Sequence, residues 1–352
     1  MKKICSILCL LLLLPALAWA RTEYKIVTAS ERGTYIQIGR DLAKWVADPA
    51  DIELEVLPSK GSAENVQRLR YEPGVKFALV QSDVYQGLLD QADTGNKQAG
   101  QIIRPLRVIL PLYDEEIYFV TRADSPLNFI HEMKDKKINV GPVGSGTALS
   151  ATTLYKLMFG QALPDANASY LSNEEALLKL TGDKSLDVVV IVAGQPAKLF
   201  MDMKPEAREF IKLLRLDDQA PEIMRATKTY FPATIRSASY PNWITEDIPT
   251  LTVKAFLVTY DYDLQMTQGH LNRFAEALCL NFDNLQNHGH PKWKQVKMEL
   301  PPLGKGWSYY PPIERVLRAC VVRRARAARP AAPPPIVKEC SQQEKVLGLC
   351  GM

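Results

Sequence analysis

The sequence has few of the residues on which metal sites and hydrolytic active sites depend. It contains four histidines, and the only close pair, His288 and His290, stands before Pro291 without a neighbouring pattern of cysteines or carboxylates. Zinc sites need several such ligands together, so we expect no metal ion and no cofactor. No Gly-x-Ser-x-Gly motif occurs either. A hydrolase, for which we can name no catalytic residues, is therefore the less favoured alternative.

Long apolar runs are missing beyond the N-terminus. Residues 1–20 combine a basic start at Lys2 and Lys3, a short apolar run and an Ala-Trp-Ala ending at Ala20. This pattern is typical of a secretory signal peptide that is cleaved after such an ending. No later stretch approaches the about 20 apolar residues of a membrane span. We therefore expect cleavage near Ala20 and an exported protein.

The excess of positive charge is small. There are 43 Lys and Arg against 39 Asp and Glu, and much of the excess lies in residues 323–329. The body of the chain therefore does not indicate nucleic-acid binding. Residues 323–352 are rich in Arg, Ala and Pro and lack apolar periodicity. Such a composition predicts a mobile linker that leads to a cysteine-containing tail.

Cysteines are also few. Of the six, two lie in residues 1–20 and would leave with the signal peptide. An even number in an oxidising compartment favours two disulfides among the four that remain, with three possible connectivities. We prefer Cys340 with Cys350, because the nine residues between them close a loop without a folded neighbour. Cys279 would then pair with Cys320.

The chain is organised around residues 138–160, which predict a short strand, a glycine-rich turn and a helix. Gly141, Gly144 and Gly146 lack Cβ atoms, so backbone N–H groups can approach a ligand there. The helix would open at Ser145 or Thr147, where unpaired N–H groups and the positive end of the helix dipole favour an anion. An ordinary capped helix after a tight turn is the alternative.

Two well-known phosphate-binding motifs do not fit this turn. A P-loop needs lysine after its second glycine, where this chain has Thr147. A dinucleotide-binding fingerprint needs a third glycine where this chain has Leu149. What remains is a hydroxyl-rich helix start, formed by Ser145, Gly146 and Thr147, that suits a carboxylate or another small anion.

Alternating strands and helices precede this turn. We predict strands at residues 24–28, 53–57 and 75–80 with helices between them, which implies an α/β fold with a mainly parallel sheet. In such sheets the ligand crevice lies at the carboxyl ends of the strands. The loops at those ends carry polar candidates for ligand binding, several of which could equally be helix caps: Thr34, Tyr35, Ser62, Asn65, Gln81, Ser82 and Asp83.

Two further strand-like segments, residues 116–121 and 252–260, have similar sequences and flank a second alternating unit. That unit contains a strand at residues 187–192, whose following loop carries Gln195 as another candidate. We infer two lobes joined by two crossing strands, with a cleft between them that closes by hinge bending. The lobes would comprise residues 21–117 with 257–322, and residues 118–256. A helix is expected at residues 268–285.

The order of these motifs resembles the TAXI-type solute receptors of tripartite ATP-independent periplasmic (TRAP) transporters. The resemblance spans residues 22–310 and rests on the motifs in residues 33–35, 60–65, 81–83, 140–147, 187–196 and 240–241. It implies a type II periplasmic binding-protein fold in a periplasmic, monomeric receptor. The ligand would be a small carboxylated solute, such as glutamate or a related dicarboxylate, delivered to a membrane permease by transient contact.

Two arginines depart from the pattern of that family. Arg32 stands where paired glycines are usual, and Arg40 stands where a small residue is usual. These changes leave the exact solute open. A periplasmic sensor or scaffold that uses the same cleft without transport is a second alternative, because the tail beyond residue 322 has no counterpart in the family. In either case we expect the solute carboxylate at residues 145–147, with Thr34, Ser62, Asn65, Gln81 and Gln195 around its other polar groups.

Overall fold

The computed structural model describes residues 21–31, 33–304, 306–327 and 342–347. The first lobe opens with β1 (Thr22–Val27), α1 (Thr34–Leu42), β2 (Ile52–Leu57), α2 (Ser62–Tyr71), β3 (Val75–Gln81), α3 (Val84–Asp93) and α4 (Lys97–Ile103). The strand β4 (Leu106–Arg122) then crosses to the second lobe. The expected strands of the first lobe are confirmed to within two residues at each end.

The second lobe contains β5 (Ile138–Asn139), α5 (Gly146–Phe159), β6 (Ala168–Ser169), α6 (Asn173–Thr181), β7 (Val188–Ala193), α7 (Lys198–Met201), β8 (Ile211–Leu213), α8 (Pro221–Ala226) and β9 (Phe231–Ile235). The strand β10 (Ile248–Tyr260) returns the chain to the first lobe, where α9 (Gln265–Leu280), α10 (Phe282–His288) and α11 (Pro311–Ala327) follow. The short helix α12 (Gln342–Val346) comes last.

A single sheet runs through both lobes. The strand order is β2-β1-β3-β10-β4-β7-β5-β6, with β8 paired to β4 and β9 paired to β10. The strands β1, β2 and β3 are parallel, whereas β10 is antiparallel to both β3 and β4. Nearly every residue of β3 is buried, as is usual for a parallel strand covered on both faces. The expected α/β fold class is confirmed.

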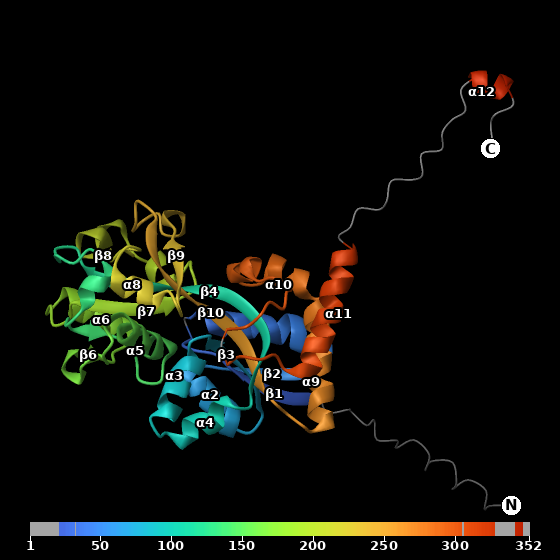
Figure 1. The fold of residues 1–352 in the computed structure, drawn as a ribbon, viewed down its shortest axis with the longest axis horizontal. Helices are drawn as coiled ribbons and strands as arrows, with labels where there is room; N and C mark the ends of the chain where they lie inside the picture. The colour runs from blue at the N-terminus through green and yellow to red at the C-terminus, as the bar shows by residue number, and fades with distance from the viewer. Residues whose placement is uncertain (1–20, 32, 305, 328–341, 348–352) are drawn as a thin grey trace, which may run out of the picture.

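The two crossing strands mark where one lobe gives way to the other. The buried apolar clusters of the first lobe include β4 as far as Tyr113 and β10 from Ala255 onward. Those of the second lobe include β4 from Ile117 and β10 as far as Val253. Figure 1 shows β4 and β10 running between the blue and orange lobe on the right and the green and yellow lobe on the left. Each lobe therefore has its own core, and the two strands pass from one core to the other.

Two predicted elements were wrong in extent. The strand expected at residues 116–121 begins ten residues earlier, at Leu106, because its first half continues the core of the first lobe. The helix expected at residues 268–285 is divided into α9 and α10 at Asn281. The Asn281 side chain donates a hydrogen bond of 3.0 Å to the Ala277 carbonyl, which is a local contact that favours a helix end.

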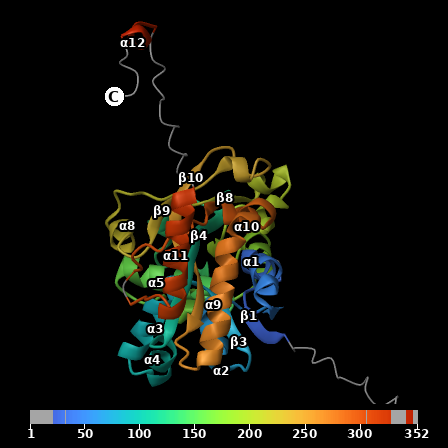
Figure 2. The same cartoon turned by 90° about the vertical axis from the view of Figure 1, so that its right-hand side faces the viewer.

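The C-terminal helix α11 packs along α9 (Figure 2). A disulfide joins Cys279 of α9 to Cys320 of α11, so this predicted pair is confirmed. Cys340 and Cys350 lie outside the described residues, as do residues 1–20. Within the described part of the chain, no helix combines the length and the apolarity that a membrane span needs.

The prediction of a mobile linker from residue 323 onward is wrong for the first five residues, which continue α11 to Ala327. Arg324 forms an ion pair with Asp283 and lies over the ring of Phe282, at 5.4 Å from the ring centre. These contacts to α10 stabilise one more helical turn in a segment of good helix-forming residues. Residues 328–341 and 348–352 lie outside the described residues.

Candidate functional site

A cavity of about 800 Å³ lies between the two lobes. It is lined by residues of α1, α2 and the end of β3 from the first lobe, and by the start of α5 and the end of β7 from the second. Seven of the predicted site residues line it: Thr34, Tyr35, Ser62, Gln81, Ser145, Gly146 and Thr147. The structure therefore brings together strand-end loops that are far apart in the sequence.

The glycine-rich turn places the first turn of α5 at this cavity. Gly141 and Gly144 have φ values of +87° and +83°, which only glycine adopts readily. Ser145 is the N-cap residue, and its Oγ accepts a hydrogen bond of 3.0 Å from the Ala148 N–H. Thr147 Oγ1 accepts from the Val192 N–H at 3.3 Å. Both hydroxyls thus serve the backbone, and the N–H groups of the first turn are what α5 offers to an anion.

Gly146 is needed because the lobes touch there. A Cβ at this position would lie 1.8 Å from Gln81 Oε1 and 2.8 Å from Ser62 Oγ. Beside it, the Glu64 N–H donates a hydrogen bond of 3.2 Å to the Gly144 carbonyl. The first turn of α5 therefore packs against the start of α2 and the end of β3, and the lobes are closed on each other.

Ser62 and Gln81 form a pair on the first-lobe side of this contact. Ser62 Oγ accepts from the Gln81 N–H at 3.0 Å and donates to Gln81 Oε1 at 3.2 Å. Both residues are buried. Among the described residues, nothing accepts a hydrogen bond from the Gln81 amide nitrogen, so this donor is left for a ligand.

Three predicted site residues of the first lobe do not line the cavity. Asn65 Nδ2 donates to the Leu79 carbonyl at 2.7 Å, so its side chain holds neighbouring strand ends together. Ser82 Oγ accepts from the Lys254 N–H at 3.3 Å. Asp83 faces the second lobe instead, through the contacts described next. Strand ends carry unpaired backbone groups, and polar side chains there are often used to satisfy them.

Asp83 is a buried carboxyl that links the lobes. Its Oδ2 accepts from the Ser150 hydroxyl at 2.6 Å and from the Tyr230 hydroxyl at 2.7 Å, and both donors belong to the second lobe. Oδ1 is buried without a hydrogen-bond partner among the described residues. Burial raises the pKa of Asp83 above its ordinary value. This side chain therefore holds the closed arrangement rather than facing the cavity.

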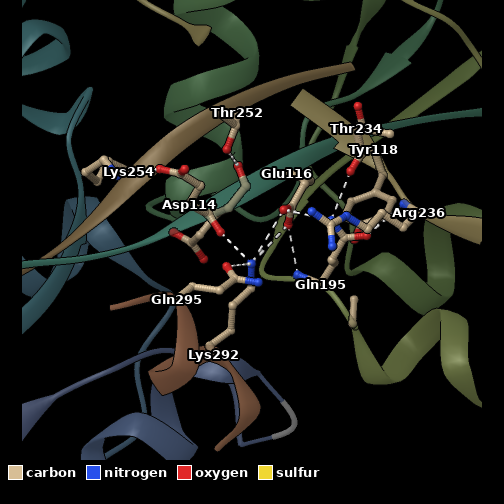
Figure 3. A network of polar contacts seen from close by, with 12 residues as sticks. Asp114, Glu116, Tyr118, Gln195, Thr234, Arg236, Thr252, Lys254, Lys292 and Gln295 are labelled. Atoms are coloured by element: carbon tan, nitrogen blue, oxygen red, sulfur yellow. Dashed lines mark hydrogen bonds and ion pairs between the residues drawn. The ribbon is translucent and has the colours of Figure 1, made fainter. Parts of the chain in front are cut away.

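Gln195 belongs to a polar network at the hinge, not to the cavity wall (Figure 3). Its backbone N–H donates to Glu116 Oε2 at 2.9 Å, and its Nε2 donates to Glu116 Oε1 at 3.0 Å. Its Oε1 accepts from the Arg236 N–H at 2.9 Å. Every polar group of this side chain is thus satisfied within the protein.

Lys292 joins the same network from the first lobe, on the 3-10 turn Pro291–Gln295. It is fully buried, with its Nζ 3.4 Å from Glu116 Oε2. It also donates to the Asp114 carbonyl at 2.7 Å and to Gln295 Oε1 at 2.9 Å. Burial lowers the pKa of Lys292. No sequence motif indicated this buried lysine.

Glu115 is the site residue that the sequence interpretation missed. It lines the cavity from β4 and is 4% exposed. Its Oε2 accepts a hydrogen bond of 2.6 Å from the Tyr35 hydroxyl. Burial raises the pKa of Glu115 to about 8. Three consecutive acids inside a largely apolar strand, residues 114–116, were the available signal, because alternation must turn neighbouring side chains to opposite faces of the sheet.

The remaining charged groups of the cavity wall come from both lobes. Lys198 and Asp202 pair with each other at 2.9 Å, and Lys60 lines the wall near Gly144. Arg40, one of the two arginines that depart from the family pattern, is exposed and does not line the cavity. In the part of the chain that the structure describes, no group of three or more His, Cys, Asp or Glu residues could hold a metal ion.

Several solved structures are similar to this chain. The periplasmic binding protein BugD is 14% identical with a TM-score of 0.47, over 87% of this chain and 96% of that chain. A Candida albicans gene product with the generic periplasmic binding protein fold is 12% identical with a TM-score of 0.48, over 88% of this chain and 92% of that chain.

A putative periplasmic sulfonate-binding protein, SsuA from Methylobacillus flagellatus, is 11% identical with a TM-score of 0.45, over 88% of this chain and 87% of that chain. The NMT1-like family model matches residues 26–301, which include most of both lobes, the crossing strands and the whole cavity wall. The chain therefore belongs to the NMT1-like family.

Proposed function

We propose that this protein is an extracytoplasmic receptor that captures a small carboxylated solute, an amino acid such as glutamate or a dicarboxylate, in the cleft between its lobes. The observation that carries the proposal is the start of α5, whose first turn meets the other lobe at the wall of the cavity between the lobes. A helix N-terminus with accessible N–H groups is a suitable site for a carboxylate.

The solute carboxylate accepts hydrogen bonds from the N–H groups of Gly146 and Thr147. The Gln81 amide and the Thr34 hydroxyl bind other polar groups of the solute from the first lobe. Each hydrogen bond to a charged group contributes about 1.5 to 3 kcal/mol, so three or four give roughly 5 to 12 kcal/mol before costs. Ordering and lobe closure reduce this gain. We expect a micromolar dissociation constant, which corresponds to a binding free energy of about −8 kcal/mol.

Binding and closure are coupled in this proposal. Only the closed arrangement lets both lobes contact one small solute, so the solute shifts the population toward that arrangement. Gly146 permits closure, since any side chain there would meet Gln81 and Ser62. The crossing strands β4 and β10 act as the hinge.

Delivery to a TRAP-type membrane permease completes the proposed function. It is supported by the resemblance of the ordered motifs to TAXI-type receptors and by an N-terminal segment with the pattern of a signal peptide. The receptor acts as a monomer that contacts the permease transiently. Uptake of labelled solute by proteoliposomes that contain the permease, with and without the receptor, tests this step. Uptake that does not depend on the receptor would contradict it.

Isothermal titration calorimetry with glutamate, glutamine, 2-oxoglutarate and C4 dicarboxylates tests the binding step. Mass spectrometry of solute released from the purified protein guides the choice of further probes. Gly146→Val should abolish binding, because the added side chain blocks both closure and the backbone approach. Gly269→Ala is the control, since a Cβ at position 269 meets nothing within 4 Å. A folded Gly146→Val protein with undiminished affinity would contradict the proposed site.

A further inference from the structure

The cavity has a second polar wall, formed by Glu115 and Tyr35 of the first lobe. The Tyr35 hydroxyl donates to Glu115 Oε2 at 2.6 Å, and both residues line the cavity. No described residue donates a hydrogen bond to the second oxygen, Glu115 Oε1. Because Glu115 lines the cavity, this oxygen is the one that can accept from a ligand.

Among the described residues, no lysine or arginine forms an ion pair with Glu115. The positive charge of Lys292 acts on Glu115, but the Lys292 ammonium is bonded to Glu116, to the Asp114 carbonyl and to Gln295. Of the two described lysines that line the cavity, Lys198 is paired with Asp202 and Lys60 lies beside Gly144. A buried carboxyl that accepts from one donor is costly unless a partner completes it. A ligand can supply the hydrogen-bond donor that the Glu115 carboxyl lacks.

We propose that Glu115, positioned by Tyr35, selects a solute that carries an ammonium group as well as a carboxylate. The preferred solutes are then amino acids, and dicarboxylates without an amine bind less tightly. This inference rests on the proposed function, because it requires the solute carboxylate to lie at the start of α5. It makes Glu115 the residue that determines specificity at the opposite end of the solute.

The protonation of Glu115 gives this selection a measurable signature. Four titratable groups act on the Glu115 carboxyl: Tyr35 from α1, Glu116 from β4, Asp83 from the end of β3 and Lys292 from the 3-10 turn Pro291–Gln295. Burial raises the pKa of Glu115 to about 8, so the empty cleft holds this carboxyl protonated at neutral pH. When an ammonium group binds, the carboxyl O–H loses its proton to the buffer, and the ammonium N–H groups donate to the carboxylate formed.

The test uses four probes that share one carbon skeleton and differ at C2: L-glutamate, 2-hydroxyglutarate, 2-oxoglutarate and glutarate. L-norvaline and valerate form a second pair without the distal carboxylate. Calorimetry at pH 6.5 in two buffers of different ionisation enthalpy reports both affinity and proton release. We expect each amino acid, L-glutamate or L-norvaline, to bind about tenfold to a hundredfold more tightly than its amine-free counterpart, glutarate or valerate. Binding of the amino acid, here called the ammonium member of its pair, should release close to one proton.

Glu115→Gln mimics the neutral carboxyl of the empty cleft and should therefore fold normally. It should remove the preference for the ammonium member and abolish proton release. Asp114→Asn is the matched control, because Asp114 is an acid on the same strand that pairs with Lys254 and does not line the cavity. Tyr35→Phe should weaken binding of the ammonium member at pH 6.5 and approach wild-type affinity near about pH 9, since the lost hydroxyl favours the ionised carboxyl.

The outcomes separate this inference from the proposed function. Equal binding of the ammonium member and its amine-free counterpart, unchanged in Glu115→Gln, would overturn the inference and leave the receptor function standing. Binding of none of the six probes by the wild-type protein would count against the proposed solute class and the inference together. A clear preference that survives in Glu115→Gln would show that another group recognises the amine.

Discussion

Glu115 and Glu116 are neighbours on β4, and they illustrate two uses of a buried carboxyl. Glu116 accepts two hydrogen bonds from Gln195 and pairs with Lys292. Glu115, on the opposite face of the strand, lines the cavity and accepts one hydrogen bond, from Tyr35, among the described residues. The fully bonded acid holds the structure together, whereas the incompletely bonded acid is the one that can still bind something.

The position of Glu116 explains why its bonds matter. Lys292 comes from the first lobe, Gln195 comes from the second, and Glu116 lies between them on the crossing strand (Figure 3). The network therefore joins both lobes at the hinge. Among the described residues, the side chain of Glu115 is hydrogen-bonded by Tyr35 of the first lobe and not by the second lobe.

Glu116→Gln should be the most damaging change to stability. It leaves the buried Lys292 ammonium without its acid, and breaking a buried ion pair in this way costs about 3 to 5 kcal/mol. Chemical denaturation measures the loss in the free energy of unfolding. The double variant Glu116→Gln, Lys292→Met should recover much of the loss, because no charge is then left buried. A loss below about 1 kcal/mol in the single variant would contradict the view that Glu116 stabilises the fold more than Glu115 does.

Glu115→Gln should have the opposite effect to Glu116→Gln: without solute it should raise the stability of the protein relative to wild type as pH rises. Because the pKa of Glu115 is raised to about 8 in the folded protein, its folded state holds a proton that the unfolded state has released above about pH 5. The stability associated with this group is full at low pH and is lost as pH rises toward 8. Wild-type stability should fall relative to Glu115→Gln by up to about 1.4 kcal/mol per pH unit between pH 5 and 8.

Thermal unfolding of the two proteins across that pH range checks this prediction. The control is Asp114→Asn, which removes a neighbouring acid that pairs with Lys254 and does not line the cavity. Parallel pH profiles for wild-type and Glu115→Gln would mean that the Glu115 carboxyl is ionised in the empty cleft.

Asp83→Asn tests a third buried acid, which joins the lobes away from the hinge. The amide retains an oxygen for the Ser150 and Tyr230 hydroxyls but loses the charge that strengthens those bonds. We expect a loss of about 1 to 2 kcal/mol in stability. The solute-free protein should also open, which small-angle scattering would detect as a larger radius of gyration. Tyr230→Phe should cause a smaller change in the same direction, and an unchanged radius in both variants would exclude Asp83 as a link that keeps the lobes closed.

Ser145→Ala should have the smallest effect on stability. It removes the N-cap of α5, which costs about 1 kcal/mol, and weakens solute binding by about tenfold through disorder of the first turn. Asn96→Ala is the control, because Asn96 caps α4 in the same way but lies away from the cavity. The two variants should lose similar stability, and only Ser145→Ala should lose affinity. Equal affinities would place the solute away from α5.

Much of the fold could be predicted from local patterns. The alternation of strands and helices predicted the strands of the first lobe. The glycine-rich turn predicted a helix that opens at Ser145 or Thr147, and in the structure Ser145 is the N-cap of α5. The extent of β4 could not be predicted in this way. Its acids interrupt the apolar pattern, yet Glu115 and Glu116 are buried in the packed structure, where Lys292 pairs with Glu116.

The residues of the candidate site likewise fall into those that sequence could predict and those that it could not. Residues such as Ser62 and Gln81 were found because loops at the ends of neighbouring strands must converge. Asn65 and Gln195 have the same chemistry and similar positions, but their side chains are used by backbone groups and by Glu116. Sequence shows which side chains are polar, whereas only the packed structure shows which of them remain unsatisfied.

A crystal structure of the protein with L-glutamate, or with the solute identified by mass spectrometry, tests the central claim most directly. The account predicts the solute carboxylate within about 3 Å of the N–H groups of Gly146 and Thr147. It also predicts an ammonium group at Oε1 of Glu115. A solute whose carboxylate lies against Lys60 or Lys198, or outside the cleft between the lobes, would contradict it.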